Sequence, residues 1–417
     1  MIIIKKIFRL LIAGAIFTFI SCVSKDANDT KANFPYDVPT DYLEEAQDIP
    51  PYWVATSKEV GDFLKNNVHK GKYELLGKSA GGRPIYAVTY GTARQGEGST
   101  TYSGAASIGK ISAFRGAESY KKVYMAIAGV HGFELEGIMG VINLISVFET
   151  GKDLNGTSWP ELASMPDSLD RIVLIPLCNP DGRDRVPIRM EKFRGSAPDA
   201  NLVHEYLNTG GREGGKLIGW PDCKEHIPLD FDKFEFPGGY PNDNGYNIMH
   251  DDFFGQMQPE TRIICDLAKR EKPDILLNMH TGVARDNYFM EVYRTHDGAY
   301  SPLLKRVWND FYRFVHTDLT LAGLRKTKDL EKETTPKAYS GGMGSMNLTS
   351  VLSFHCGALA VTIEDASHGY TGVYDDGTPV EHTPLKILSS ELTAHQAAMK
   401  FLLQKGGADQ WGNDYVN

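Results

Sequence analysis

Two histidines and a glutamate in this sequence have the types and spacing of a metal site. His131 and Glu134 lie three positions apart in "GVHGFE", directly after an apolar run, and His280 lies in "NMHTG". Two histidines and one carboxylate are the ligands of one class of catalytic zinc site, whose fourth position stays open for water. Such a site needs a base to accept a proton from water, and Glu364 in "AVTIED" is the candidate. The alternative is structural, with histidines hydrogen-bonded at a sheet rim and an ion-paired carboxylate.

Each of these residues follows an apolar run that is predicted to be a buried strand. The runs and the residues that end or follow them are 122–130 and His131, 171–177 and Asn179, 275–279 and His280, and 358–363 and Glu364. In sheets built mainly from parallel strands, ligands bind just beyond the carboxyl ends of the strands. The sequence therefore predicts that these side chains gather at one edge of a sheet.

Helical patterns alternate with these strands. One helix is predicted from about Glu134, a second begins at Pro259, and a third covers residues 385–405 with a strong amphipathic pattern. Residues 72–91 are predicted to be two strands joined by a Gly-Gly turn. Interleaved strands and helices indicate an α/β domain whose sheet is covered on both faces. Residues 183–257, rich in Gly, Pro and Asp, are predicted to be long loops over one rim of the sheet.

The N-terminus has the layout of an export signal. Basic residues, an apolar run of about a dozen residues and Ser21 precede Cys22 in "MIIIKKIFRLLIAGAIFTFISC". The ending "FISC" resembles a bacterial lipobox, whose cysteine becomes the lipidated first residue of the mature chain. The alternative is an ordinary secretory signal with an incidental cysteine. We therefore expect an exported lipoprotein of the cell envelope, on the periplasmic or surface face of the outer membrane.

This interpretation divides the chain into four parts. Residues 1–21 are the lipoprotein signal peptide, 22–45 a flexible tether, 46–406 the catalytic domain and 407–417 a C-terminal tail. The expected partners are the membrane, through a lipid on Cys22, and a peptide substrate.

Composition excludes other classes of partner. The chain has 44 basic and 53 acidic residues, a formal net charge of −9 and no basic cluster, so nucleic acid is not an expected partner. Beyond Cys22 it has four cysteines with no CxxC pair, so a cysteine zinc cluster is not expected either. Cys178 lies in an apolar run and is predicted to be a small buried hydrophobic residue. One or two disulfides would be compatible with export, and the sequence assigns none.

Six motifs, in order, resemble those of the zinc carboxypeptidase family, from about residue 72 to residue 405. They are "YELLGKSAGGRPIYAVTYG", similar to the family's first hairpin; "GVHGFE", similar to its HxxE zinc motif; "NPDG"; "PETRII", similar to the helix before the second zinc histidine; "NMHTG", which bears that histidine; and "VTIED", similar to the strand of the catalytic glutamate. Each motif is modest alone, and six in order are specific. The resemblance implies a single α/β domain with a mixed, mostly parallel central sheet flanked by helices on both faces.

The resemblance also implies an activity. His131, Glu134 and His280 would hold one Zn²⁺, and Glu364 would be the general base. The protein would then be a zinc-dependent metallopeptidase that hydrolyses the C-terminal or near-terminal amide bond of extracytoplasmic peptides.

Two further family residues are carried over by their place in the chain. The family uses an arginine about a dozen residues beyond "NPDG" to polarise the scissile carbonyl and hold the oxyanion, and Arg194 lies at that distance, with Arg189 as a nearby rival. The family also has a tyrosine on a mobile loop near a Ser-Gly-Gly. Tyr339 is near that place, although its offset from the glycines differs.

The sequence departs from the family where the substrate's terminal carboxylate is normally bound. The family carries an Asn-Arg pair before the "PET" helix, whereas this chain has Asn247 and His250 and no arginine between Arg212 and Arg262. Protonated His250, or Arg285 after "HTG", would have to replace the missing guanidinium.

Two other functions remain as alternatives. A zinc amidohydrolase, such as a deacylase or a murein-peptide amidase, would use the same metal site without an arginine clamp. A catalytically inactive lipoprotein that binds peptides or glycans at the cell surface is an alternative from another class.

Overall fold

The structure is a computed structural model that describes residues 35–195, 198–219, 222–225, 228–282, 290–293, 302–324, 346–369, 371–373 and 377–414. Cys22 and the predicted signal peptide lie outside these ranges, and so do Arg285 and Tyr339.

A seven-stranded sheet forms the centre of the molecule, in the order β1-β2-β4-β3-β7-β9-β8. Its strands are β1 (Lys72–Lys78), β2 (Pro84–Gly91), β3 (Val123–Ala128), β4 (Arg171–Ile175), β7 (Ile275–Gly282), β8 (Met290–Tyr293) and β9 (Leu359–Ala366). The four strands β4, β3, β7 and β9 run parallel, while β1, β2 and β8 pair antiparallel with their neighbours at the two edges. The mixed sheet with a parallel centre confirms the predicted fold class.

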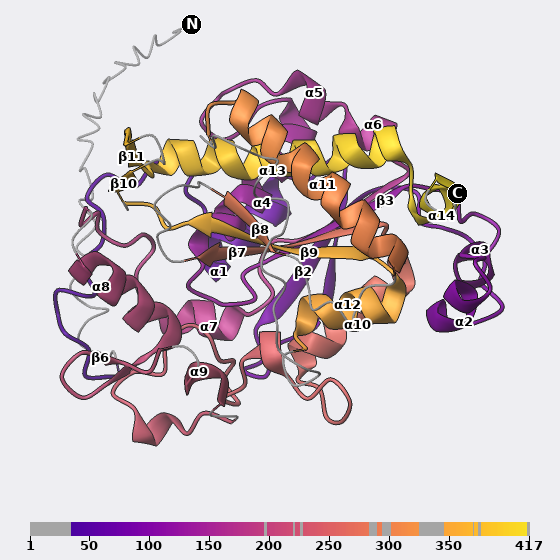
Figure 1. The fold of residues 1–417 in the computed structure, drawn as a ribbon. Coiled ribbons are helices and arrows are strands. Elements are labelled where there is room, and N and C mark those ends of the chain that lie inside the picture. The colour runs from indigo at the N-terminus through magenta and orange to yellow at the C-terminus, as the bar shows by residue number, and fades with distance from the viewer. Residues whose placement is uncertain are drawn as a thin grey trace, which may run out of the picture. The chain divides into compact units, whose positions relative to one another are not determined.

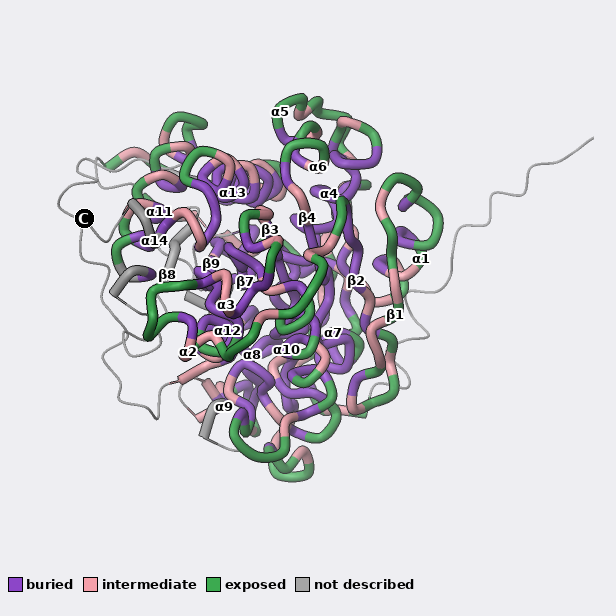
Figure 2. Tube along the Cα trace, turned by 90° about the vertical axis from the view of Figure 1, so that its right-hand side faces the viewer, coloured by how far each residue is buried: buried purple, intermediate pink, exposed green. Residues whose placement is uncertain are grey.

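The central strands are apolar along their whole length because both faces of the sheet are covered. All of β3 is buried, and β7 is buried up to Thr281. The edge strand β1 alternates between exposed and half-buried residues instead. In Figure 2 the buried residues accordingly gather around β3, β7 and β9, whereas β1 is mostly exposed or half-buried.

Helices cover both faces of the sheet (Figure 1). On one face lie α4 (Leu135–Thr150), α11 (Pro302–Leu321) and α13 (Pro384–Lys405), with α4 against β3 and β7 and α13 against β9. On the other face lie α10 (Pro259–Glu271) and α12 (Leu348–Cys356). These two helices pack on each other, and α10 also packs on β1 and α12 on β9. The apolar run of α4 is buried from Leu135 to Glu149, so this helix lies within the core and not on the surface.

Shorter elements complete the described part of the chain. The helices are α1 (Ser57–Asn67), α2 (Tyr102–Ser107), α3 (Ser112–Arg115), α5 (Pro160–Ala163), α6 (Met165–Ser168), α7 (Pro180–Arg185), α8 (Pro198–Thr209), α9 (Asp222–Glu225), η2 (Phe231–Lys233), η3 (Ile248–His250) and α14 (Ala408–Asp414). Two small antiparallel pairs are β5 (Gly211–Arg212) with β6 (Lys216–Leu217) and β10 (Thr371–Val373) with β11 (Pro379–Glu381).

The prediction of loops over residues 183–257 was wrong for α8, which is a twelve-residue helix. Val203, Tyr206 and Leu207 are buried with the spacing of one helical face. The surrounding polar residues and the many glycines that follow obscured this helical spacing in the sequence.

The folded unit extends beyond both predicted domain boundaries. It begins at Tyr36, and residues 36–45, which we assigned to the tether, bury Val38 and Leu43. At the other end, residues assigned to the tail form α14, whose Trp411 has no exposed surface.

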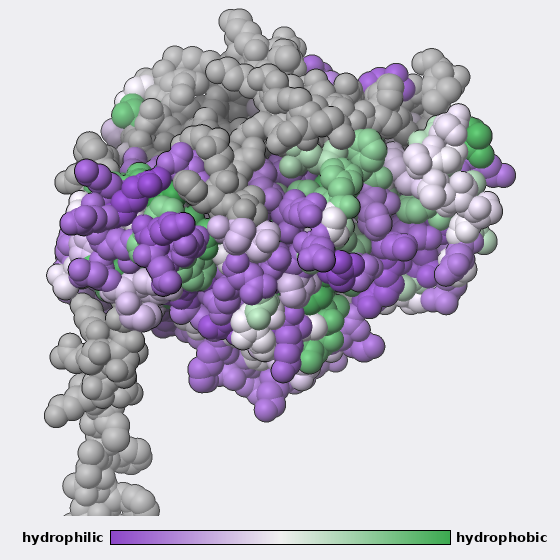
Figure 3. Space-filling model, turned by 90° about the horizontal axis from the view of Figure 1, so that it is seen from below, coloured by the Kyte–Doolittle hydropathy of each residue, from purple (hydrophilic) through white to green (hydrophobic). Residues whose placement is uncertain are grey.

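Cys178, Cys223, Cys265 and Cys356 are all buried free thiols, which confirms the prediction for Cys178. Within the described ranges, no helix combines the length and the apolar character needed to cross a membrane. Hydrophilic residues cover most of the coloured surface in Figure 3, and the apolar residues there form small, separate patches.

Candidate metal centre

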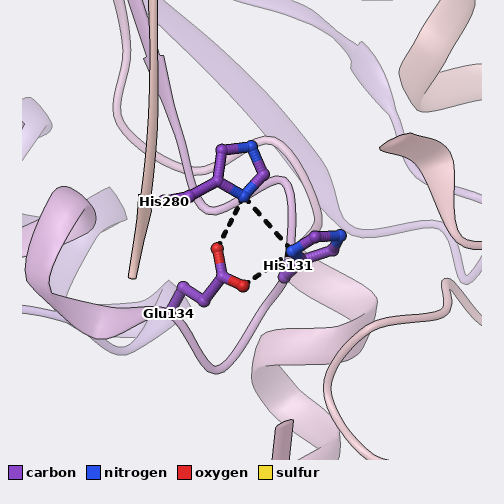
Figure 4. A group of neighbouring side chains, drawn as sticks. All are labelled: His131, Glu134 and His280. Atoms are coloured by element: carbon purple, nitrogen blue, oxygen red, sulfur yellow. Dashed lines mark hydrogen bonds and ion pairs between the residues drawn. The ribbon is translucent and has the colours of Figure 1, made fainter. Parts of the chain in front are cut away.

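The two histidines and the glutamate that the sequence singles out lie together in the structure (Figure 4). The Glu134 carboxylate lies between the two imidazoles, with Oε1 2.7 Å from His131 Nδ1 and Oε2 2.7 Å from His280 Nδ1. The two Nδ1 atoms are 3.3 Å apart. His131 lies in the turn after β3, Glu134 directly precedes α4, and His280 belongs to β7. The prediction that strand ends bring these residues to one place is confirmed.

The turn between β3 and α4 requires glycine for two separate reasons. Gly129 has a φ of 61°, a left-handed conformation that favours glycine. At Gly132 a Cβ atom would lie 2.1 Å from the backbone nitrogen of Arg183, and the Gly132 amide donates to the Gly239 carbonyl at 2.8 Å. Three backbone segments therefore meet behind His131, and this close packing fixes the position of its ring.

The donor set fits a tetrahedral zinc ion. Zn–N bonds of about 2.0–2.1 Å in tetrahedral geometry place two nitrogen ligands about 3.3 Å apart, which is the separation of the two Nδ1 atoms. His131 Nε2 lies 3.1 Å from Asn247 Oδ1, so the ring proton is on Nε2 and the Nδ1 lone pair is free to bind a metal. The Glu134 oxygens and the two Nδ1 atoms converge on one position, as the ligands of a single cation would.

Burial and charge act against each other at these three residues. Burial favours the neutral form of Glu134, but the two histidines outweigh this effect and lower its pKa. Burial lowers the pKa of His131, although Glu134 opposes it. His280 is also buried, but Glu134 and Glu364 together raise its pKa. An ionised carboxylate between two imidazoles is the state that a divalent cation needs.

Glu364 lies beside this cluster on the neighbouring strand. In the parallel pairing of β7 and β9, Glu364 is the register partner of His280. A Cβ atom at Gly282 would lie 3.1 Å from Glu364 Oε2, so the carboxylate extends over a residue that has no side chain. Glu364 is half-buried while the three ligands are 5% exposed or less, so its side chain is more open to solvent than theirs.

Sequence reasoning missed several residues that hold the centre in place. Asn208 Nδ2, on α8, donates to Glu134 Oε1 at 3.2 Å, and the Tyr240 ring stacks on His131 with a centroid distance of 3.5 Å. Glu136 accepts a hydrogen bond from the hydroxyl of Thr281, next to His280. The helical spacing in α8 could have revealed Asn208, whereas nothing in the sequence pairs Tyr240 with His131.

Three of the motifs named above, namely the first hairpin, "NPDG" and the "PET" helix, are joined in one hydrogen-bonded hub. Asp181 of "NPDG" is fully buried and accepts from the Ser79 hydroxyl, the Gly81 amide and Arg83 Nη1, all in the turn of the first hairpin. Glu260 of the "PET" helix accepts from the Ala80 amide at 2.9 Å. This hub connects the hairpin with the loops on which Tyr240 and Asn247 lie.

Asn247 contacts a metal ligand in the structure. Its Oδ1 accepts from both His131 Nε2 and the Met249 amide, and its side chain is buried. We predicted a substrate-binding role for Asn247, and its contact with His131 indicates a role in orienting that ring. His250 ends the neighbouring helix η3 and is half-buried.

The predicted oxyanion residue, Arg194, lies in a different environment from the metal ligands. Its Nη2 donates to the Asp41 carbonyl, and it lines a cavity together with His204 and His368. Its rival Arg189 pairs with Glu59 on α1 at 2.5 Å. The oxyanion role of Arg194 stays a prediction.

Comparisons with known proteins agree with the fold and the centre. Residues 67–309 match the sequence profile of the zinc carboxypeptidase family. Because this match spans more than half of the 417 residues, the chain belongs to that family. No curated protein matches the sequence.

Solved structures share the fold at low sequence identity. A metallo-carboxypeptidase from Burkholderia cenocepacia superposes with a TM-score of 0.50 and 15% identity, over 83% of this chain and 69% of that one. A metallo-carboxypeptidase from Pseudomonas aeruginosa, in complex with (2-guanidinoethylmercapto)succinic acid, superposes with a TM-score of 0.49 and 14% identity. The superposition covers 85% of this chain and 69% of that one.

Proposed function

We propose that this protein is a zinc-dependent metallopeptidase that removes residues from the C-terminal end of extracytoplasmic peptides. The observation that carries the proposal is the placement of Glu364 directly beside His280, in register, next to a two-histidine, one-carboxylate ligand set. Membership of the zinc carboxypeptidase family supports the same chemistry.

His131, Glu134 and His280 would hold one Zn²⁺ through Nδ1, a carboxylate oxygen and Nδ1 respectively. When bound, the zinc would polarise the scissile carbonyl and lower the pKa of water at the centre towards about 7. Glu364 accepts the proton of the attacking water and returns it to the leaving amine, since it lies beside the ligands but is not one of them. Asn247 and Tyr240 keep the His131 ring in place throughout.

The extracytoplasmic location rests on the sequence alone. The basic residues, apolar run and Cys22 of the N-terminus support export and lipid attachment to the cell envelope. A domain on a lipidated N-terminus would meet peptides outside the cytoplasm, which include those of the cell wall.

An amidohydrolase or murein-peptide amidase is the second candidate. It is favoured by the absence of an arginine between Arg212 and Arg262, where the family resemblance leads us to expect a carboxylate clamp. Asn247, the remaining member of that clamp, is engaged with His131.

Digestion of a mixed peptide library, read by mass spectrometry, tests the proposal. We expect the loss of C-terminal residues, abolished by a zinc chelator and restored by added Zn²⁺. Release of acyl groups or cleavage of murein peptides alone would favour the second candidate. A library that remains intact in the zinc-loaded sample, with murein peptides also intact, would contradict both.

A further inference from the structure

A small, partly open cavity of about 20 Å³ lies between the segment after α7, helix α8 and the end of β9. Its polar lining consists mainly of Glu191, Lys192, Arg194, His204, Ser367 and His368. None of these residues takes part in the peptidase mechanism derived above, apart from the sequence-based prediction for Arg194.

Four lining residues of this cavity are basic, and three of them are paired with carboxylates. Burial lowers the pKa of His204, but Glu191 at 2.8 Å more than offsets it and raises that pKa to about 9. His368 is likewise buried, and Glu136 raises its pKa. Lys192 is paired with Glu44 at 2.6 Å. In the part of the chain that the structure describes, Arg194 pairs with no carboxylate, so its charge is not neutralised locally.

Three buried polar atoms of the lining residues have no hydrogen-bond partner among the described residues. They are Nε of Arg194, Nε2 of His204, a residue that is 5% exposed, and the hydroxyl oxygen of Ser367, a residue that is 7% exposed. Leaving a buried donor unpaired costs free energy, which a ligand with acceptor oxygens would recover. An anion with two oxygens suits a guanidinium without a carboxylate partner and these unpaired donors.

The cavity adjoins the metal centre through covalent and hydrogen-bonded links. His204 lies one turn of α8 before Asn208, which donates to Glu134, so the two side chains are about 6 Å apart along the helix axis. His368 Nδ1 lies 2.7 Å from Glu136, two residues beyond Glu134. Ser367 follows Glu364 by three residues. The cavity lining is therefore linked to Glu134 and Glu364 by short stretches of chain and by hydrogen bonds.

We propose that this cavity binds a carboxylate of the substrate, held by Arg194 and Lys192 with His204 and Ser367 as hydrogen-bond donors. The proposal rests on the proposed peptidase function and names a substrate class for it, namely peptides with a carboxylate near the scissile bond. The cavity would bind the carboxylate in place of the arginine that is missing before the "PET" helix. The carboxylate comes either from the free C-terminus or from an acidic side chain.

Peptide binding to the full-length Glu364→Gln variant tests the subsite without turnover. Calorimetric titration would use two matched pairs: N-acetyl-trialanine as acid and as amide, and amidated N-acetyl-Ala-Glu-Ala and N-acetyl-Ala-Gln-Ala. We expect one acidic peptide to bind about tenfold more tightly than its neutral counterpart, since charge-assisted hydrogen bonds carry the difference. A preference in the first pair identifies the terminal carboxylate, and one in the second pair an acidic side chain. Equal affinities within both pairs would overturn the proposal.

Variants in the Glu364→Gln background locate the binding. Arg194→Gln, Lys192→Gln and His204→Gln should each reduce the preference for the acidic peptide several-fold. Lys233→Gln is the matched control, because Lys233 is exposed and paired with Asp230 much as Lys192 is with Glu44, and it should keep the preference. Lys192 is 51% exposed, so its variant keeps the test valid if His204→Gln fails to fold. A preference that survives both Arg194→Gln and Lys192→Gln would contradict the assignment.

Steady-state kinetics separate this role of Arg194 from oxyanion stabilisation. With Glu364 intact, Arg194→Gln should raise KM for the preferred acidic peptide about tenfold and change kcat little. A loss confined to kcat would assign Arg194 to the transition state and overturn its part in the subsite. If the wild type cleaves no peptide while the Glu364→Gln protein still prefers acidic peptides, the peptidase proposal fails and the subsite stands. If the wild type cleaves acidic and neutral peptides equally well, the subsite proposal fails and the peptidase proposal stands.

Discussion

At the scale of single residues, the metal centre depends on side chains that bind no metal. Asn247 accepts from His131 Nε2, Tyr240 stacks on the same ring, and Asn208 donates to Glu134. Each contact restricts the rotation of a ligand side chain before the metal binds. Metal binding then costs less conformational entropy. Mutation of such hydrogen-bond partners commonly lowers metal affinity by about 10- to 100-fold.

We predict that Asn247→Ala weakens zinc affinity about 10- to 100-fold. The alanine cannot accept the Nε2 proton, so the tautomer that presents Nδ1 to the metal loses its support. Competition with a chromogenic zinc chelator would measure the change. Asn155→Ala, at an exposed position in a surface turn, is the control. An unchanged affinity in Asn247→Ala would show that His131 is oriented without this hydrogen bond.

The sequence predicted the ligands and the base because they depend on local rules. His131, His280 and Glu364 each lie at the end of an apolar run, and strand order brings such ends together. The residues that the prediction missed depend on loops. Tyr240 reaches His131 only because the loop around Gly239 packs against Gly132, a contact between distant segments that no periodicity reveals.

At the scale of elements, two connections shape the site: the turn from β3 to α4, and helix α8. The turn depends on Gly132, whose amide donates to Gly239 while its α-carbon lies against the backbone of Arg183. Helix α8 places His204 beside the cavity and Asn208 beside Glu134.

Gly132→Ala should destabilise the protein by about 1–3 kcal/mol and reduce zinc binding. The new methyl group would lie 2.1 Å from a backbone nitrogen, so the turn or the "NPDG" segment must shift. Thermal unfolding and metal analysis would measure both effects. Gly61→Ala is the control, since a Cβ atom in α1 meets nothing within 4 Å. A Gly132→Ala protein with normal stability and zinc content would show that the turn adapts at no cost.

The ion pair of His204 with Glu191 makes stability depend on pH. Because the pKa of His204 is raised from its unfolded value of about 6.5 to about 9, the pair contributes fully below about pH 6.5 and is lost as the pH rises through about 9. We expect the difference in unfolding free energy between wild type and His204→Gln to shrink between pH 6 and pH 9.5, by about 1–3 kcal/mol. Urea unfolding at both pH values tests this. A constant difference would mean that His204 is neutral.

At the scale of the whole molecule, the folded unit is larger than the sequence predicted. Residues 36–45 pack onto it, with the Lys192 amide donating to the Glu44 carbonyl at 3.0 Å. At the C-terminus, the Ala408 amide donates to Asp274, and Trp411 is fully buried. The polar composition of both segments suggested a tether and a tail, because composition does not show which few apolar residues find a place in the core.

We therefore predict that Trp411→Ala destabilises the protein by about 3–5 kcal/mol. The change leaves a cavity the size of an indole ring next to α11, on which α14 packs. Urea unfolding would measure it, with Phe254→Ala, at an 82% exposed position, as the control. Equal stability of the two variants would mean that α14 is a dispensable tail.

The most direct test of the account is zinc content and peptide hydrolysis, measured side by side in the wild type and in Glu364→Gln. We predict one zinc per chain in both proteins and hydrolysis in the wild type alone, because His131, Glu134 and His280 hold the metal and Glu364 moves the proton. Wild-type protein that binds no zinc, or a Glu364→Gln variant that retains turnover, would contradict it.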